Sequence, residues 1–187
     1  MRRPPAARWL LMAALCVACM HGAGLGVAWA GGNPMLVGKV VPPYPQGFRS
    51  NTGSCVGVGT GVDQLCARSI ATLDDDEDRT VQLLAAQFVE RVGDQPRWRI
   101  TDSVPYPALR RDELVAIATC QRNGVDDTGV VAIIDTGAEG ASELDMLPAV
   151  RWAVRLDRGS GKFLRVTPSS VRCYNEEIGR ASCRERV

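Results

Sequence analysis

The chain has 187 residues, of which 45% are hydrophobic, 23% charged and 5% aromatic, and its formal charge is +1. This composition is that of an ordinary globular domain, and it excludes a collagen-like, low-complexity or multi-span membrane protein. Residues 31–176, which we expect to form the folded part, hold 16 basic and 19 acidic residues, for a formal charge of −3. Nucleic-acid binding requires a concentrated basic surface, so we expect no nucleic-acid partner.

The first 30 residues have the three parts of an export signal. Three arginines form a positive start, an apolar run follows from Trp9, and Ala28-Trp29-Ala30 provides a small-residue cleavage site. The alternative is an uncleaved anchor, because Trp9 to Ala30 is long enough to span a bilayer. We expect a signal peptide over 1–30, a periplasmic or secreted protein, and no membrane span after cleavage.

Four cysteines lie between the expected signal and the C-terminal tail: Cys55, Cys66, Cys120 and Cys173. An even number in an exported chain predicts two disulfides, for which three connectivities exist. We favour Cys55–Cys66, whose members are close in sequence around a Gly-rich turn, together with Cys120–Cys173. A zinc site of four thiolates would need C-x-x-C spacings, which are absent from this sequence.

The only histidine of the chain, His21, lies in the expected signal peptide. The mature domain would then have neither Ser-His-Asp nor Cys-His catalysis, and no histidine to bind a metal. We expect no cofactor and no metal site, because no motif in the sequence points to either one.

Two segments after residue 73 allow more than one interpretation. Asp74 to Asp78 is a run of five acids that lacks the central glycine and closing Glu of an EF-hand loop. We expect a solvated loop there, or the acidic start of a helix. Residues 79–92 have apolar side chains at helical spacing, which favours a helix. A strand is the alternative, because residues 93–96 make a plausible hairpin turn.

From residue 114 onward the patterns are those of strands. The apolar runs 114–118 and 130–134 predict a hairpin with an enlarged loop, which contains the turn signal Asn123-Gly124. Residues 151–156 alternate as in a half-buried strand, and residues 162–166 return after a Gly-Ser-Gly turn. We expect an α+β fold: a small, mainly antiparallel sheet built from hairpins with at most one or two helices, stapled by two disulfides.

The last eleven residues, 177–187, resemble one translated frame of a common sequencing adapter. The alternative is a native basic tail that is solvated and disordered. We expect non-native read-through over 177–187. The domain organisation is then a signal peptide over 1–30 and a single exported globular domain over 31–176.

One short motif suggests catalysis. The apolar segment Ala132 to Ala138 contains Asp135-Thr136-Gly137 and resembles the active-site motif of retropepsin-type aspartic proteases. The resemblance implies that Asp135 is an acid/base sharing a proton with a twin Asp, because two adjacent carboxylates do not both ionise easily. Thr136 would brace Asp135, and Gly137 would allow the twin to approach closely.

The same resemblance requires a homodimer to supply the twin, and a second apolar stretch that ends in glycine. The candidate for that stretch, Ile178-Gly179, lies within the suspect tail. Apart from the resemblance, an apolar strand that ends in Asp-Thr-Gly is explained by an ordinary turn, where Asp and Gly are favoured.

Two functions from different classes follow. The first is an exported, disulfide-stabilised binding, inhibitor-like or envelope-associated module without catalytic activity, whose partner would be another envelope or extracellular protein. Its candidate contact residues are Tyr44, Phe48, Tyr106 and Tyr174, because interfaces favour tyrosine, although such residues also cap cores. The alternative is a homodimeric retropepsin-like aspartic protease that uses Asp135.

Overall fold

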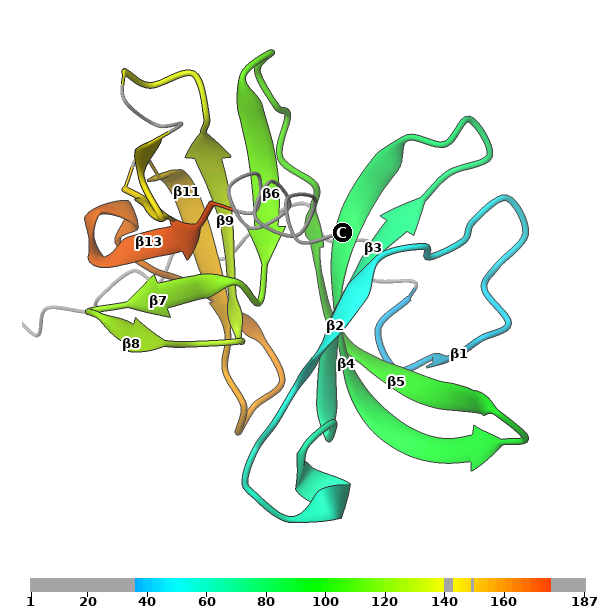
Figure 1. Ribbon diagram of the computed structural model, residues 1–187. Helices are drawn as coiled ribbons and strands as arrows, with labels where there is room; N and C mark the ends of the chain where they lie inside the picture. The colour runs from blue at the N-terminus through cyan, green and yellow to red at the C-terminus, as the bar shows by residue number, and fades with distance from the viewer. Residues whose placement is uncertain (1–35, 140–142, 149, 176–187) are drawn as a thin grey trace, which may run out of the picture.

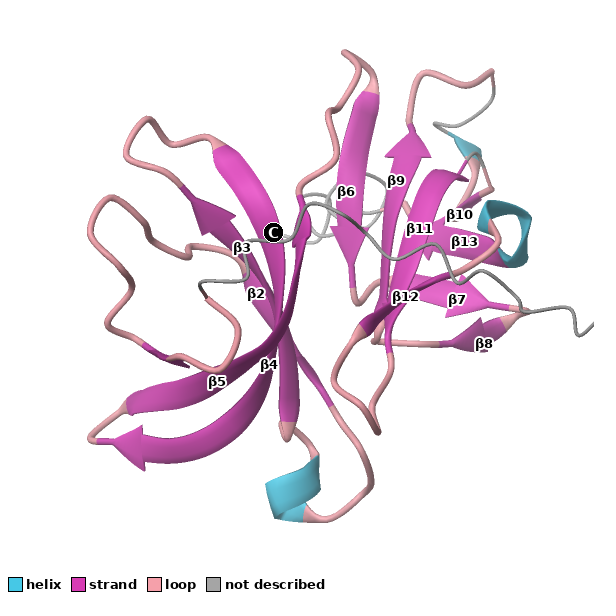
Figure 2. Cartoon of the chain, turned by 180° about the vertical axis from the view of Figure 1, so that it is seen from behind, coloured by secondary structure: helices cyan, strands magenta, loops and turns pink. Residues whose placement is uncertain are grey.

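The chain folds into three antiparallel sheets that are stacked on one another (Figures 1 and 2). The computed structural model describes residues 36–139, 143–148 and 150–175, so the expected signal peptide and the tail 177–187 lie outside the described residues. Within them the strands are β1 (Val40–Val41), β2 (Gly53–Val56), β3 (Arg68–Asp74), β4 (Thr80–Val92), β5 (Gln95–Pro105), β6 (Glu113–Ile117), β7 (Cys120–Arg122), β8 (Val125–Asp126), β9 (Val130–Asp135), β10 (Met146–Leu147), β11 (Val150–Leu156), β12 (Phe163–Arg165) and β13 (Val171–Tyr174).

The expected α+β class is wrong in its helical part. The described residues contain short 3₁₀ turns, such as η1 (Val62–Gln64) and η3 (Pro168–Ser170), and no α-helix. The protein is mainly antiparallel sheet with two disulfides, and it is closer to all-β than to α+β. In the described residues no helix is long and apolar enough to cross a membrane.

The helix favoured for residues 79–92 is wrong, because this segment is strand β4. The alternative prediction, a strand followed by a hairpin turn, is confirmed. β4 pairs with β5 through a tight turn in which Gly93 has a φ of +60°. Four consecutive residues of β4, Leu83 to Ala86, are buried because the strand is covered on both faces. Two register shifts along the strand further disturb the two-residue period. An apolar run without alternation therefore mimicked the spacing of a helix.

Sheet B, with the order β12-β11-β9-β6, forms the middle layer. The side chain of Val131 on β9 packs toward sheet A, which has the order β1-β5-β4-β3-β2. Ala132 and Ile134 on the same strand pack toward sheet C, which has the order β10-β13-β7-β8. Residues 130–134 are at most 1% exposed, which explains why this strand reads as a continuous apolar run.

The hairpin predicted from residues 114–118 and 130–134 is confirmed, because β6 pairs with β9 in antiparallel register. Its enlarged loop has a structure of its own. The segment between the two strands forms β7 and β8, joined by the Asn123-Gly124 turn, and belongs to sheet C. One connection in the sequence therefore contributes to two layers of the fold.

The strands expected over 151–156 and 162–166 are also present, as the β11–β12 hairpin. Strand β11 is more buried than half-buried, because Ala153, on the face that it shares with Arg151 and Arg155, is covered by sheet C and is 4% exposed. The hairpin turn is held against sheet A by hydrogen bonds. Thr101 donates from Oγ1 to the carbonyl of Gly161 at 2.7 Å, and the backbone N–H of Phe163 donates to Asp102 Oδ2 at 2.8 Å.

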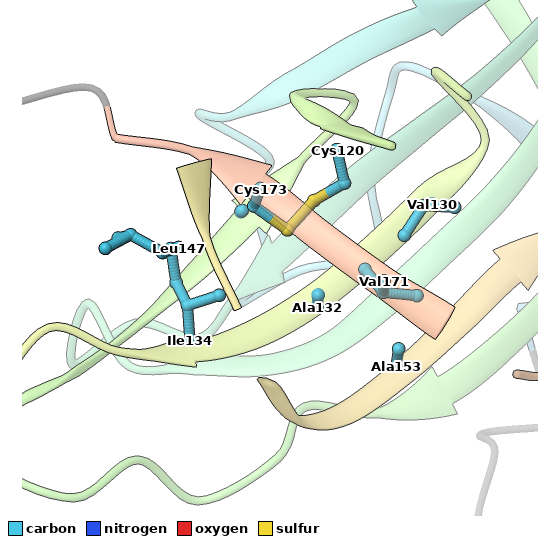
Figure 3. Close-up of a cluster of buried hydrophobic side chains, with 9 residues drawn as sticks. Cys120, Val130, Ala132, Ile134, Leu147, Ala153, Val171 and Cys173 are labelled. Atoms are coloured by element: carbon cyan, nitrogen blue, oxygen red, sulfur yellow. A yellow bond between two sulfur atoms is a disulfide. The ribbon is translucent and has the colours of Figure 1, made fainter. Parts of the chain in front are cut away.

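Both expected disulfides are confirmed. Cys55–Cys66 closes the loop that contains η1, next to strand β2. Cys120 and Cys173 are directly opposite each other on β7 and β13, and their disulfide lies in the core between sheets B and C (Figure 3). Two disulfides fit an oxidising environment, extracellular or periplasmic.

Candidate functional site

A pocket of about 290 Å³ lies on the face of sheet A that points away from sheet B. β1 and β2 lie at opposite edges of this sheet, so the connection between them, residues 42–52, has to pass from one edge to the other. This connection contributes Tyr44 and residues 50–52 to the pocket wall. The pocket thus lies between a sheet face and a strap of chain, and it is open to solvent.

The floor of the pocket is hollow because its side chains are small. In register across three strands, Cys55 lies opposite Ser69 and Ser69 opposite Ala86. In the neighbouring row, Gly53 lies opposite Ala71. All five residues line the pocket. Larger apolar side chains surround this floor: Val41, Leu84, Trp98 and Ile100.

The floor is close-packed at Gly53. A β-carbon at this glycine would lie 2.9 Å from the carbonyl oxygen of Ile70 and 3.2 Å from the Cβ of Ala71. Only glycine lets β2 approach β3 at this point without a shift of the backbone. The pocket floor therefore depends on this residue.

The strap is tied to the sheet by polar contacts. Within the strap itself, the side chains of Tyr44 and Ser50 are hydrogen-bonded, and burial raises the pKa of Tyr44, with the Ser50 bond opposing the rise. Asn51 donates from Nδ2 to Asp74 Oδ2 at 3.2 Å, and the backbone N–H of Thr72 donates to the carbonyl of Thr52 at 2.8 Å. These contacts hold the strap above the floor.

The lining of this pocket is uncharged. Its polar members are Ser50, Asn51, Thr52, Ser54, Ser69 and the Tyr44 hydroxyl, and the remainder are apolar or glycine. Small-molecule sites combine such an apolar wall with a few polar groups that fix the orientation of the ligand. A charged group would be desolvated there without a charged partner, which is costly. The arrangement suits a small neutral molecule with an apolar body.

Of the four aromatic residues expected to make contacts, the structure places Tyr44 in this pocket. Phe48, on the same strap, is 36% exposed, whereas Tyr106 is half-buried and packs against the core between sheets A and B. Tyr174 is exposed on sheet C and donates from its hydroxyl to Asp126 Oδ1 at 2.9 Å. The structure thus does not bring the four together.

The Asp135-Thr136-Gly137 motif lies at the end of β9 and in the turn that follows it. Asp135 Oδ1 accepts a hydrogen bond from the backbone N–H of Gly137 at 2.9 Å, as in an Asx turn. Thr136 donates to the carbonyl of Asp112 through both Oγ1, at 3.1 Å, and its backbone N–H, at 2.8 Å. Thr136 therefore braces the motif against the loop before β6.

A second carboxylate lies beside this motif. A β-carbon at Gly137 would be 3.3 Å from Asp112 Cγ and 3.4 Å from Asp135 Oδ1, so the two aspartates flank the glycine. The sequence motif did not identify Asp112, because it precedes Asp135 by a whole hairpin. The cross-strand pair Glu113–Asp135 would have revealed this proximity once the register was known.

Residues 75–78 of the acidic run form the turn between β3, which ends at Asp74, and β4, so the expected loop is present and the helix start is not. The loop is not solvated throughout, because Asp74 and Asp75 are 7% and 8% exposed. Asp75 Oδ1 accepts from the backbone N–H groups of Glu77 and Arg79, and Arg79 pairs with the same carboxylate. The Arg79 hydrogen bonds hold the pKa of Asp75 below its usual value, against a smaller effect of burial. In the described ranges, no three potential ligand residues come together to hold a metal ion.

Comparisons with protein-family models, with curated proteins and with solved structures find no match to this chain.

Proposed function

We propose that this protein is an exported binding module that holds a small neutral molecule in the pocket on sheet A. The observation that carries this proposal is the uncharged lining of a preformed pocket of about 290 Å³, with small side chains on the floor and apolar ones around it. The volume is close to the lower end of ligand sites, roughly 300 Å³, and suits a molecule of one or two rings. The hydroxyl and amide groups on the strap would bind its polar end.

Export is part of the same proposal. The disulfides support an oxidising compartment, and the N-terminal pattern supports cleavage after Ala30. N-terminal sequencing of the exported protein tests it, with Gly31 expected as the first residue. A mature chain that still begins at Met1 would contradict the cleavage.

Ligand binding is tested with naphthol, a neutral two-ring probe, and with its charged analogue naphthalenesulfonate. In a Trp152→Phe background, Trp98 is the tryptophan of residues 31–187 that reports on the pocket through its fluorescence. We expect saturable binding of naphthol, and at least tenfold weaker binding of the sulfonate, roughly the effect of one unpaired polar group.

The matched variants are Ala71→Phe, which fills the floor, and Ala108→Phe, which places the same ring at an exposed position outside the pocket. We expect the first to abolish naphthol binding and the second to leave it unchanged. Ser69→Phe fills the same floor from a neighbouring row and serves where Ala71→Phe does not fold. Equal binding by the filled and control variants would refute the pocket as the site.

The second candidate is the homodimeric aspartic protease, in which the twin of Asp135 would come from a second copy, and the bracing of the Asp135 turn by Thr136 is the observation that favours it. A pair of nearby carboxylates can share one proton and activate water. Peptide cleavage at mildly acid pH that is lost in folded Asp135→Asn would support this candidate. If the unmodified protein cleaves no peptide, the protease is excluded and the binding module is the function that remains.

A further inference from the structure

A second hollow, of about 260 Å³, lies between the β7–β8 hairpin and the end of β11, away from the pocket on sheet A. Its lining combines one apolar side chain with five charged ones: Arg122, Val125, Asp126, Asp127, Arg155 and Arg158. Three guanidinium groups against two carboxylates give the lining an excess of positive charge. This excess stands out in a domain whose formal charge is −3.

The three arginines converge on Asp127, which is 8% exposed. Arg155 Nε lies 2.5 Å from Oδ2 and Arg158 Nη2 lies 3.0 Å from Oδ1, which also accepts from the backbone N–H of Gly129. Burial by itself would raise the pKa of Asp127, but these hydrogen bonds and charges outweigh it and lower the pKa. Asp127 is therefore an anion that holds the arginines in place.

One carboxylate cannot accept hydrogen bonds from all the donors of three guanidinium groups, because each guanidinium has five N–H groups. Arg122 comes only to 3.9 Å of Asp127, beyond hydrogen-bond distance, and no hydrogen bond of its guanidinium is present in the part of the chain that the structure describes. In the same described residues, the hydrogen bond of the Arg155 side chain is made by Nε, and its two terminal nitrogens make none. Unused donors thus line the hollow.

The other carboxylate, Asp126, is engaged by neutral partners. Its Oδ1 accepts from Gln121 Nε2 and from the Tyr174 hydroxyl, each at 2.9 Å. Its charge opposes an incoming anion, but it does not occupy the donors of Arg122 or Arg155. The excess of guanidinium donors is therefore available to a ligand.

We propose that this hollow, which we call the arginine site, binds a tetrahedral oxyanion: phosphate or sulfate, free or as a small ester. Guanidinium groups present planar pairs of donors that match the oxygens of these anions. Arg122 and Arg155 bind the oxyanion. Arg158, whose Nε also donates to the carbonyl of Gly57 at 2.8 Å, is a positioning residue that ties the site to sheet A. Val125 provides an apolar wall for the substituent of an ester.

The test is calorimetric titration of the full chain with inorganic phosphate, sulfate and chloride at constant ionic strength. We expect saturable binding of phosphate and of sulfate, and none of chloride. Arg122→Gln removes a guanidinium that makes no hydrogen bond in the described structure, so this variant is expected to keep its fold. It should weaken phosphate binding by about tenfold, the effect of one charge-assisted hydrogen bond.

Arg111→Gln is the matched control, because Arg111 is exposed, lies outside the hollow and carries the same charge. It should leave phosphate binding unchanged. If phosphate and sulfate do not bind the unmodified protein, or if both variants weaken binding equally, the inference is wrong. The first result would mean that the arginines have a purely structural role. The second would mean that phosphate binding depends on the overall charge of the protein and not on this hollow.

Discussion

Arg151 on β11 and Glu113 on β6 form a bidentate ion pair that spans the strand between them, β9. Arg151 Nε lies 2.5 Å from Glu113 Oε1, and Nη2 lies 2.7 Å from Oε2. Arg151 also donates to the carbonyl of Ala108 at 2.9 Å. Glu113 is the cross-strand neighbour of Asp135. The Arg151–Glu113 ion pair therefore lies beside the Asp-Thr-Gly turn, at one end of sheet B.

This ion pair predicts a pH dependence of stability. The Arg151 hydrogen bond, opposed by desolvation, lowers the pKa of Glu113 from 4.5 to about 2. A carboxylate with a lowered pKa in the folded state stabilises the fold above its unfolded pKa, and this contribution is lost as the pH falls from 4.5 toward 2. The difference in unfolding free energy between the unmodified protein and Glu113→Gln should be constant near neutral pH and shrink over that interval. Denaturant unfolding as a function of pH measures it, and a constant difference down to pH 2 would contradict it.

The two disulfides should differ in their effect on stability. In the chain-entropy model, a loop of 53 residues stabilises by about 4 kcal/mol and one of 11 residues by about 3 kcal/mol. Replacing Cys120 and Cys173 by alanine should therefore cost more than replacing Cys55 and Cys66, and the buried position of the first pair adds to the difference. Urea unfolding of the two double variants measures it, and an equal loss would refute the ranking.

Reduction should follow the same order for a separate reason. Cys55 is exposed, whereas Cys120 and Cys173 are at most 2% exposed. A mild reductant should reach Cys55–Cys66 first, because exchange requires access of the attacking thiolate. Alkylation followed by mass spectrometry distinguishes the two pairs. Labelling of Cys173 before Cys55 would contradict the burial of the inner disulfide.

The position of β9 between two cores predicts that adjacent residues on opposite faces are equally sensitive. Ile133→Ala and Ile134→Ala should each cost about 2–5 kcal/mol, the usual range for buried aliphatic side chains. Leu164→Ala on β12 is the control, because Leu164 is 50% exposed, and it should cost about 1 kcal/mol or less. A loss confined to one of the two isoleucines would mean that one face of β9 is solvated.

The hairpins of the C-terminal half could be predicted from the sequence because their signals are local. A hairpin such as β11–β12 has its turn and its alternating residues within one short segment. The pairing Cys55–Cys66 was predictable for the same reason. β4 was not, because its double burial removes the alternation that identifies a strand.

The pocket on sheet A could not be predicted, since its floor is assembled from strands that are distant in the sequence. Ser69 and Ala86 come together only through the register of β3 and β4. In hindsight, the repeated small residues at alternate positions were a usable signal: Gly53 and Cys55 on β2, and Ser69 and Ala71 on β3. The arginine site depends in the same way on the placement of Arg122 and Arg155 beside Asp127.

Because sheet B packs against both outer sheets, it also affects how the protein unfolds. Sheet C buries its apolar face against sheet B, and sheet A buries one of its faces there, while the other face of sheet A has a small core of its own. Opening sheet B exposes both of its interfaces at once, so it removes one core from sheet A and the core of sheet C together. The amide hydrogens of β9, which lies between these two cores, should therefore be among the slowest of the domain to exchange.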